Sequence, residues 1–318
     1  MSKTSPFKVF SGTNSKYLAE KICNSLGCEL GNMNITHFAD GEFAVSFEES
    51  IRGAHVFLVQ STFPNSDNLM ELLLMIDAAK RASAKSIVAV IPYFGWARQD
   101  RKDKPRVSIG AKLVADLLSV AGIDRLITMD LHAGQIQGFF DIPVDHLGSA
   151  SIIAKYINQK KEETDMGDIV VVSPDLGGVT RARDLADRVN APIAIIEKRR
   201  PRPGVAEVMN IIGDIKGKTC ILVDDIVDTA GSLCGGAKAL KEMGASRVFA
   251  ACAHAVLTDP AVERIQKSVI SELIITNTIP LPPEKQIDKI KVLSVAPLLG
   301  EAIMRIFHDV SVSRLFDK

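Results

Sequence analysis

The stretch from Thr219 to Ser232 combines residue types that could bind a sugar phosphate. It opens with a short apolar, β-branched run, Thr219 to Val223, which is typical of a strand buried on both faces of a parallel sheet. Asp224 and Asp225 follow at the carboxyl end of this strand, where open α/β sheets bind ligands. Their carboxylates could accept hydrogen bonds from neighbouring ribose hydroxyls.

Five small or polar residues lead from this strand into a helix expected over 232–243: Asp228, Thr229, Ala230, Gly231 and Ser232. They supply two hydroxyls, a glycine that can take a positive φ, and the unpaired N–H groups of a helix N-terminus. These groups are donors for a phosphate. The structural alternative is an ordinary helix N-cap next to two solvated acids.

This element resembles the phosphoribosyl-diphosphate (PRPP) binding motif. The motif is shared by type I phosphoribosyltransferases and ribose-phosphate diphosphokinases. The rest of the chain has to distinguish between these two classes of enzyme.

The composition limits the class of protein. A length of 318 residues suggests two domains of ordinary size. The 38 basic residues balance 38 acidic ones, so no overall charge attracts the chain to nucleic acid or to a membrane. The five cysteines are odd in number and include no Cys-x-x-Cys pair, which indicates a reducing compartment. Residues 1–6 lack the apolar core of a signal peptide, and no apolar run approaches the length of a membrane span, so we expect a cytoplasmic protein.

Apolar runs of strand length alternate with helical patterns along the chain, which predicts an α/β fold with mainly parallel sheets flanked by helices. The boundary between the two units is expected between Pro143 and Ser151, giving domains 1–147 and 148–318, with the last residues packing back on the first domain. Strands are expected over 8–10, 55–60, 86–93, 125–130, 169–172, 193–196, 219–223, 247–253, 273–276 and 292–295. Helices are expected over 15–26, 68–82, 109–121, 149–159, 179–189, 232–243, 261–267 and 298–307.

A hairpin expected over 35–47 has a turn with an aromatic ring and two carboxylates. Phe38 could stack on an adenine ring while a carboxylate of Asp40 or Glu42 accepts from its amino group. The alternative is an ordinary hairpin in which Gly41 supplies the turn conformation.

The segment 95–107 interrupts the α/β pattern with five cations and two acids. Because it directly follows a strand, Arg98 and its neighbours could close over a polyphosphate, since guanidinium groups pair bidentately with phosphate oxygens. A solvated run of charges is the alternative.

His132 and Asp175 both follow apolar strands, so they are expected on the same rim as Asp224. A nucleoside triphosphate needs Mg²⁺, which prefers oxygen ligands, so Asp175 suits that metal while a lone histidine is more often structural. Lys198 and Arg200 belong to a basic run that follows another strand. They could bind charge developing on a transferring phosphoryl group, or form a flexible surface loop.

Taken together, these segments resemble the ribose-phosphate diphosphokinase (PRPP synthetase) family of the phosphate-activated class, and the resemblance covers essentially the whole chain. It is carried by Phe38-Ala39-Asp40-Gly41-Glu42, Ala97-Arg98-Gln99-Asp100, Asp130-Leu131-His132-Ala133, Pro174-Asp175 with Gly177-Gly178, Lys198-Arg199-Arg200, and Asp224-Asp225 with Asp228-Thr229-Ala230-Gly231.

The resemblance implies that ribose 5-phosphate attacks the β-phosphorus of ATP through its C1 hydroxyl, giving PRPP and AMP. It also implies two phosphoribosyltransferase-like domains, a Mg²⁺ requirement and a homohexamer. The implied roles are ATP binding by Phe38, Asp40, Gly41, Glu42, Arg98 and Gln99; magnesium binding by His132 and Asp175; catalysis by Lys198 and Arg200; and ribose 5-phosphate binding by Asp224, Asp225 and residues 228–232. Adenine binding would cross a subunit interface.

The chain departs from the family pattern at two positions. Ser232 stands where threonine is usual, which keeps the hydroxyl, and Arg314 stands where an aromatic residue is common. By resemblance, an allosteric site for phosphate or ADP between subunits would be lined by Arg52, Arg106, Ser108, Ser311 and Ser313. Ordinary surface and terminal residues are the alternative.

Two other functions are compatible with parts of the sequence. A phosphoribosyltransferase shares the segment from Asp224 to Ser232, but it would not need the amino-terminal ATP elements or Lys198-Arg199-Arg200. A non-catalytic relative that only binds partners should have lost residues of the site, and every expected residue is in place.

Overall fold

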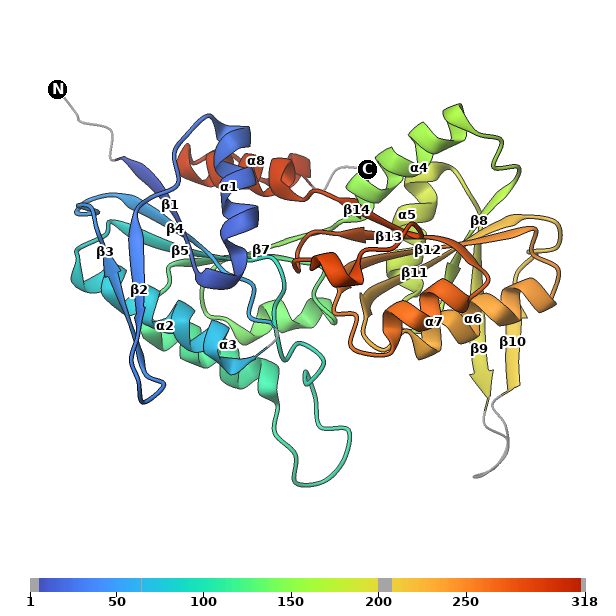
Figure 1. The fold of residues 1–318 in the computed structure, drawn as a ribbon, viewed down its shortest axis with the longest axis horizontal. Coiled ribbons are helices and arrows are strands. Elements are labelled where there is room, and N and C mark those ends of the chain that lie inside the picture. Colours follow the sequence, from blue (N-terminus) through green and yellow to red (C-terminus); the bar gives the residue numbers. More distant parts are fainter. Residues whose placement is uncertain (1–5, 64, 200–207, 316–318) are drawn as a thin grey trace. The chain divides into compact units, whose positions relative to one another are not determined.

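The computed structural model describes residues 6–63, 65–199 and 208–315, which form two compact units (Figure 1). The first unit holds the chain up to Gly148, a short segment at Thr278–Pro280, and the chain from Val295 onward. The second holds Ser149–Asn277 and Leu281–Ser294. The last helix therefore belongs to the unit in which the chain begins.

The first unit is built on a five-stranded sheet in which every neighbouring pair is parallel, in the order β1-β4-β5-β6-β7. Its strands are β1 (Phe7–Ser11), β4 (His55–Val59), β5 (Ser86–Ile91), β6 (Arg125–Met129) and β7 (Val144–Leu147). Its helices are α1 (Lys16–Leu26), α2 (Ser66–Arg81), α3 (Gly110–Ala121) and α8 (Ala296–Phe307).

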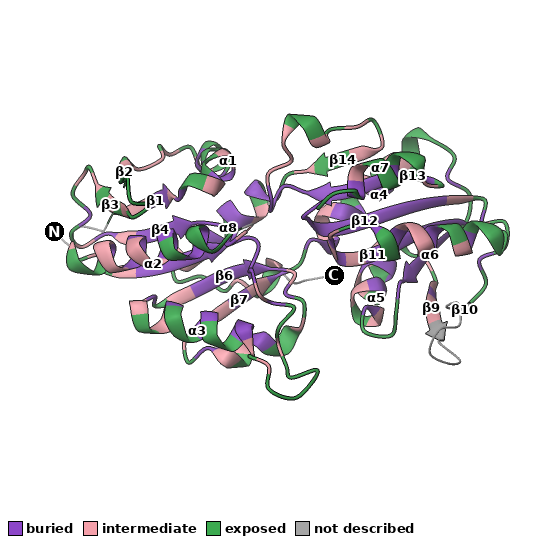
Figure 2. Cartoon of the chain, turned by 60° about the horizontal axis from the view of Figure 1, so that its bottom comes forward, coloured by how far each residue is buried: buried purple, intermediate pink, exposed green. Residues whose placement is uncertain are grey.

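Alternate residues of these strands face opposite helix layers, as the two-residue period of a strand requires. Val56 and Leu58 of β4 pack in a core with residues of α2 and α3. The intervening Phe57 and Val59 are also buried, and α1 and α8 lie on that side of the sheet (Figure 1). The central strands are consequently covered on both faces, and β4 is buried from Val56 to Val59, drawn purple in Figure 2.

A separate antiparallel hairpin joins β2 (Met33–His37) to β3 (Phe43–Phe47). Along it, half-buried residues such as Val45 alternate with exposed ones, so only one face packs on the rest of the unit. The hairpin predicted over 35–47 is therefore confirmed.

The second unit contains a seven-stranded sheet in the order β10-β9-β8-β11-β12-β13-β14. Its strands are β8 (Ile169–Ser173), β9 (Ile193–Arg199), β10 (Val208–Ile212), β11 (Thr219–Val227), β12 (Arg247–Ala255), β13 (Ile270–Thr276) and β14 (Ile290–Leu293). Residues of α4 (Ala150–Glu163) and α5 (Val179–Val189) share one core with this sheet. Residues of α6 (Gly231–Glu242) and α7 (Ala261–Lys267) share another, so helices flank both faces.

The structure corrects three expectations about strands. β7 was not expected, because Asp145 and His146 interrupt its apolar pattern; it is held by pairing with β6 at the sheet edge. β10 was not expected either. It pairs antiparallel with β9 at one edge, so the sheet is mainly parallel, as predicted, with one antiparallel pair. β11 continues to Val227, so Asp224 and Asp225 lie inside a strand that was expected to end at Val223.

All five cysteines are free thiols in the structure. Cys23, Cys220 and Cys252 are buried among apolar side chains. Within the ranges that the structure describes, no helix has both the length and the apolar character that a bilayer crossing demands.

Candidate functional site

The loop between β5 and α3 is anchored at both ends. The Gly95 amide donates to Thr62 Oγ1 at 2.7 Å, and a Cβ at this glycine would lie 2.5 Å from the Thr62 carbonyl oxygen, so no larger residue fits. The Ala111 amide donates to the Gln99 carbonyl at 3.2 Å, which holds Arg98 and Gln99 at the start of α3. Residues 101–106 between these anchors are exposed. This is the long teal loop before α3 in Figure 1.

Arg98, Gln99 and His132 line one cavity of about 450 Å³. The structure therefore brings together residues from the loop before α3 and from the loop after β6. The remaining lining residues are Asp100, Arg101, Asp103, Val107 and Ser108. Two arginines and two aspartates face this space, so an anion would be selected by the placement of the guanidinium groups rather than by net positive charge.

A residue that sequence reasoning passed over supports the His132 loop. The Leu131 amide donates to His146 Nε2 at 2.8 Å, and His146 lies on β7 next to β6. The strand pairing brings His146 opposite Thr128, just before the loop. Because β7 was not recognised in the sequence, nothing there marked His146 as a neighbour of His132.

One of the two acids of the hairpin turn, Asp40, accepts a hydrogen bond from the backbone of the turn itself. The Glu42 amide donates to Asp40 Oδ1 at 3.0 Å, and Gly41 has a φ of 95°, which favours glycine. Glu42 is exposed, and the Phe38 side chain is 51% exposed at the tip of a polar turn. None of these residues lines the cavity around Arg98.

In the second unit, Asp224 and Asp225 lie near the end of β11. The Asp225 side chain is 6% exposed and that of Asp224 is 29% exposed, so neither acid is fully solvated. The Asp225 amide donates to Asp224 Oδ1 at 2.9 Å. Arg181 of α5 lies beside both carboxylates, with Nη1 3.7 Å from Asp224 Oδ1 and 3.5 Å from Asp225 Oδ1.

Burial raises the pKa of Asp224 from its ordinary value to about 7, and the adjacent Asp225 carboxyl adds to the effect. The guanidinium of Arg181 acts in the opposite direction. Asp224 consequently changes charge near neutral pH, where its ability to accept hydrogen bonds from hydroxyls also changes.

The loop after β11 is a bare helix N-terminus rather than a capped one. The residue with positive φ is Ala230, at 57°, and not Gly231 as expected. α6 begins at Gly231 with no hydrogen bond from a capping side chain. Because the N-cap residue Ala230 supplies no capping side chain, the first N–H groups of α6 are candidates to bind an anion.

Arg264 of α7 is a second residue that sequence reasoning missed. Its Nη1 donates to the Thr229 carbonyl at 2.9 Å and ties this loop to α7. A Cβ on Gly231 would lie 3.5 Å from the same atom, so the guanidinium stands directly beside the helix start. Only tertiary packing of α7 on α6 brings it there.

Asp175 follows β8 and holds the start of α5. Its Oδ1 accepts from the Gly178 amide at 2.9 Å, and the residue is exposed. A second carboxylate oxygen is therefore available on a side chain whose orientation is fixed by its own loop.

The donor set suits magnesium better than a metal that needs a complete protein cage. The described residues include no cluster of three or more His, Cys, Asp or Glu side chains able to hold a metal ion. Mg²⁺ commonly keeps several waters and takes one or two protein ligands together with phosphate oxygens. The exposed carboxylate of Asp175 fits such a role.

The expected catalytic pair is only partly described. Lys198 lies in β9 and pairs with Met209 of β10, so its backbone belongs to a strand rather than to a loop. The Lys198 side chain and the whole of Arg200 lie outside the described residues.

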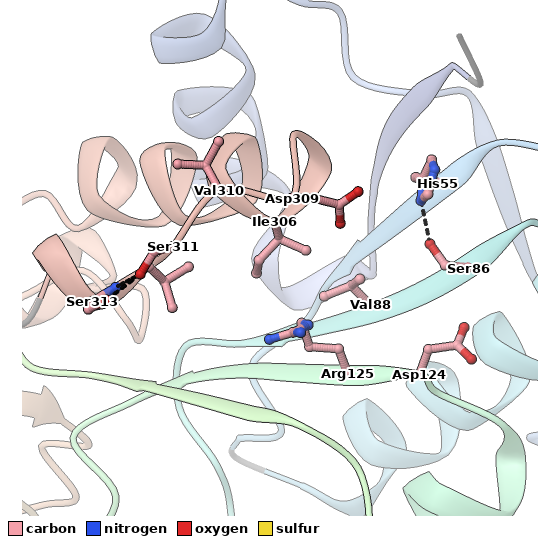
Figure 3. Close-up of a pocket in the computed structure, with 11 residues that line it drawn as sticks. His55, Ser86, Val88, Asp124, Arg125, Ile306, Asp309, Val310, Ser311 and Ser313 are labelled. Carbon is pink, nitrogen blue, oxygen red and sulfur yellow. Dashed lines mark hydrogen bonds between the residues drawn. The ribbon is translucent and has the colours of Figure 1, made fainter. Parts of the chain in front are cut away.

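The expected allosteric residues occupy several places. Ser311 and Ser313 line a cavity of about 670 Å³ in the first unit, together with His55, Ser86 and Arg125 (Figure 3). Arg52 donates to Ser83 Oγ at 3.1 Å. Ser108 lines the other cavity, beside Arg98, and Arg106 is exposed on the same loop with a φ of 63°. One chain therefore does not gather all five around one cavity.

The fold and the loop after β11 place the chain among α/β proteins of the phosphoribosyltransferase-like class. Residues 7–122 match the model of the N-terminal domain of ribose phosphate pyrophosphokinase, and residues 198–317 match that of the phosphoribosyl synthetase-associated domain.

Relatives match over the full length. The chain is 60% identical to the ribose-phosphate pyrophosphokinase of Porphyromonas gingivalis, over 99% of both chains. It is also 60% identical to that of Bacillus cereus, over 98% of both. The crystal structure of phosphoribosylpyrophosphate synthetase from Mycobacterium smegmatis is 42% identical, with a TM-score of 0.90, over 96% of this chain and 100% of that one. The chain belongs to the ribose-phosphate pyrophosphokinase family.

The raised pKa of Asp224 predicts an unusual dependence of stability on pH. The unfolded chain loses this proton near the ordinary aspartate pKa of 3.8, whereas the folded chain keeps it up to about pH 7. Stability from this group is therefore present in acid and is lost as the pH rises through that window. Asp224→Asn, which mimics the protonated form, should raise Tm by a few degrees at pH 8 and by much less at pH 5.

Thermal unfolding of both proteins across this pH range measures the difference. Asp259→Asn, at an exposed acid in the same unit, is the control and should leave the pH dependence as in the wild type. A destabilised Asp224→Asn at pH 8 would contradict the assignment of the proton.

Proposed function

We propose that this chain transfers the diphosphoryl group of ATP to the C1 hydroxyl of ribose 5-phosphate, giving 5-phosphoribosyl 1-diphosphate and AMP for nucleotide biosynthesis. The C1 oxygen forms a bond to the β-phosphorus, the bond from that phosphorus to the bridging oxygen of the α-phosphate breaks, and the hydroxyl proton is lost. The observation that carries the proposal is a family match that extends over 99% of the chain and so over both units.

The proposed ATP site uses Arg98 and Gln99 for the triphosphate. Both residues line the cavity of the first unit, and the backbone contact to α3 limits their movement. Phe38, Asp40, Gly41 and Glu42 would bind the adenine. The half-exposed ring of Phe38 supports this role, since a ring at a polar turn is available for stacking.

The proposed ribose 5-phosphate site uses the loop after β11. The uncapped start of α6 and the hydroxyls of Thr229 and Ser232 suit the 5-phosphate, since N–H groups at a helix start bind anions. Asp228 directly follows β11 and is the first residue of this loop. Asp224 and Asp225 would accept from the ribose hydroxyls, which requires an ionised carboxylate on at least one of them.

The chemistry needs alignment and neutralisation of charge more than a strong base. Lys198 and Arg200 are the proposed catalytic residues, and they would stabilise negative charge that develops on the transferring group. Pairing of β9 with β10 runs through Lys198, which gives its backbone a defined position in the sheet.

Magnesium is the proposed cofactor, with His132 and Asp175 as ligands. When bound, Mg²⁺ neutralises the triphosphate oxygens. Asp175 offers the carboxylate oxygen that this hard cation prefers, and the contact with the Gly178 amide holds its orientation. His132 is the less usual ligand, and its support is the family resemblance and its place beside Arg98.

The main test of this function is AMP formation from ATP, ribose 5-phosphate and Mg²⁺. The wild type should form AMP only when ribose 5-phosphate is present. Lys198→Ala should lower turnover by about 100-fold or more, because it removes a cation from the developing charge.

Lys238→Ala is the matched control, since Lys238 is an exposed lysine on α6 that pairs with Glu242. It should retain wild-type turnover. Near-normal turnover in Lys198→Ala would contradict its catalytic role. A folded wild type that forms no AMP would favour a partner-binding relative, and PRPP-dependent transfer to a base instead would identify a phosphoribosyltransferase.

We also propose a homohexamer, in which the adenine-binding hairpin completes the site of a neighbouring subunit. Its support is the family resemblance and the absence of Phe38, Asp40 and Glu42 from the lining of the cavity around Arg98. Light scattering should give six times the chain mass of 34.4 kDa, and a monomer that forms AMP at full rate would contradict the proposal.

Phosphate and ADP are the proposed effectors, bound by Arg52, Arg106, Ser108, Ser311 and Ser313. Ser311 and Ser313 both line the cavity, and the Ser313 amide donates to Ser311 Oγ at 3.2 Å, which holds the two serines together beside this space (Figure 3). Their hydroxyls could donate to an anion. Ser108 and Arg106 would come from the loop of another subunit.

Ser313→Ala should reduce activation by phosphate and inhibition by ADP several-fold, while activity at a fixed phosphate concentration without ADP stays measurable. The initial rate of AMP formation against each effector is the measurement. Ser271→Ala, at an exposed serine in the other unit, should respond like the wild type. Unchanged regulation in Ser313→Ala would count against this site.

A further inference from the structure

We propose that Arg181 is a positioning residue that keeps Asp224 ionised and oriented to accept hydrogen bonds from the ribose hydroxyls. The proposal rests on the proposed function of the loop after β11 and adds a residue that binds no substrate in that scheme. Arg181 acts through Asp224, and so it tunes the affinity for ribose 5-phosphate as a function of pH.

The first support is the placement of the guanidinium between two carboxylates. Its Nη1 lies 3.7 Å from Asp224 Oδ1 and 3.5 Å from Asp225 Oδ1, so one cation serves both acids. The Arg181 side chain is 21% exposed and that of Asp225 is 6% exposed, so solvent screens these charges incompletely. At these distances the interaction is mainly electrostatic rather than a short hydrogen bond.

The second support is the position of Arg181 in its helix. It is the third residue of α5, in the first turn, where the partial charge of the helix dipole is positive. An acid stabilises that end of a helix, and Asp175 already supplies one through the Gly178 amide. A cation there is unfavourable for the helix itself, so its place is explained by the acids of β11.

The third support is the set of groups that face Asp224. Asp225 lies on the same strand as Asp224. On the neighbouring strand β12, Cys252 pairs with Asp224. His254, also on β12 and buried, pairs with Ile226. Burial raises the pKa of the Cys252 thiol well above its ordinary value, so Cys252 stays neutral. Among the residues that the structure describes, Arg181 lowers the pKa of Asp224 against the effects of burial and Asp225.

The consequence for binding follows from the chemistry of the carboxyl group. An ionised carboxylate accepts hydrogen bonds from two hydroxyls, whereas a protonated one gives up an acceptor site and presents a donor. An opposite charge at such distances lowers a carboxyl pKa by about one unit or more. Without Arg181, a carboxyl that titrates near pH 7 would titrate near pH 8, and its ionised fraction at pH 7 would fall about fivefold.

The experiment compares kcat/KM for ribose 5-phosphate from pH 6 to 9.5 in the wild type, Arg181→Gln and Arg181→Lys. In the wild type, kcat/KM should rise with pH as Asp224 ionises, and we call this rise the acidic limb of the profile. Arg181→Gln should move the acidic limb upward by about one pH unit, lowering kcat/KM about fivefold at pH 7 and much less at pH 9. Arg181→Lys should restore most of the wild-type profile. Arg183→Gln, at an exposed arginine on the same helix, is the control and should leave the profile unchanged.

Two outcomes would overturn the proposal. An acidic limb in Arg181→Gln that coincides with that of the wild type would show that Arg181 does not act on the ionisation. A uniform loss at every pH, with no shift of the limb, would show a purely structural role. In the Asp224→Asn background, Arg181→Gln should no longer shift the limb, and a shift that persists there would assign the titration to another group.

A readout without activity separates this proposal from the proposed function. In the wild type, Tm should decline as the pH rises because Asp224 loses its proton. This decline should move to higher pH in Arg181→Gln and should be absent in Asp224→Asn. A wild type that forms no AMP would overturn the proposed function, and with it the role toward ribose. The shift of the Tm profile would then still decide whether Arg181 controls the ionisation of Asp224, and an unchanged profile would reject that control.

Discussion

Two neighbouring carboxylates near the end of β11 are taken largely out of water, and this constraint organises the second unit. Burying one acid disfavours its charge, and burying two adjacent acids adds their mutual repulsion. Among the described residues, the guanidinium of Arg181 lies beside both acids, and burial raises the pKa of Asp224 to about 7. A site held this way gives up some stability in order to hold a group that can change its charge near neutral pH.

Parallel strands explain where the functional loops lie. In the five-stranded and the seven-stranded sheet the strands run in the same direction apart from β10, so the loops that follow them emerge at one edge. In the first unit these are the loops around Arg98 and His132, and in the second they are the loops around Asp175 and residues 228–231. The same arrangement therefore recurs in both units, and the residues of the loops distinguish the two proposed sites.

Charge in this protein is balanced locally as well as overall. Equal numbers of basic and acidic residues exclude a general attraction for anions, and the cavity beside Arg98 also mixes arginines with aspartates. Recognition of a triphosphate at the proposed site would then depend on the geometry of guanidinium groups and backbone donors. The anchors at Gly95 and Ala111 provide such geometry at both ends of an otherwise exposed loop.

Local sequence patterns were sufficient to predict most helices and strands and the residue types of the loops between them. The helices over 179–189 and 261–267, the hairpin turn at Gly41 and the small-residue loop before α6 follow from periodicity and turn residues, which act over a few positions of the chain. Tertiary structure decided the rest. β7 and β10 exist because of pairing across the sheet. Ala230 rather than Gly231 takes the positive φ. Three side chains reach their partners only through the packing of distant segments, namely those of Arg181, His146 and Arg264. These contacts join residues far apart in the chain, and no local preference of the backbone encodes them.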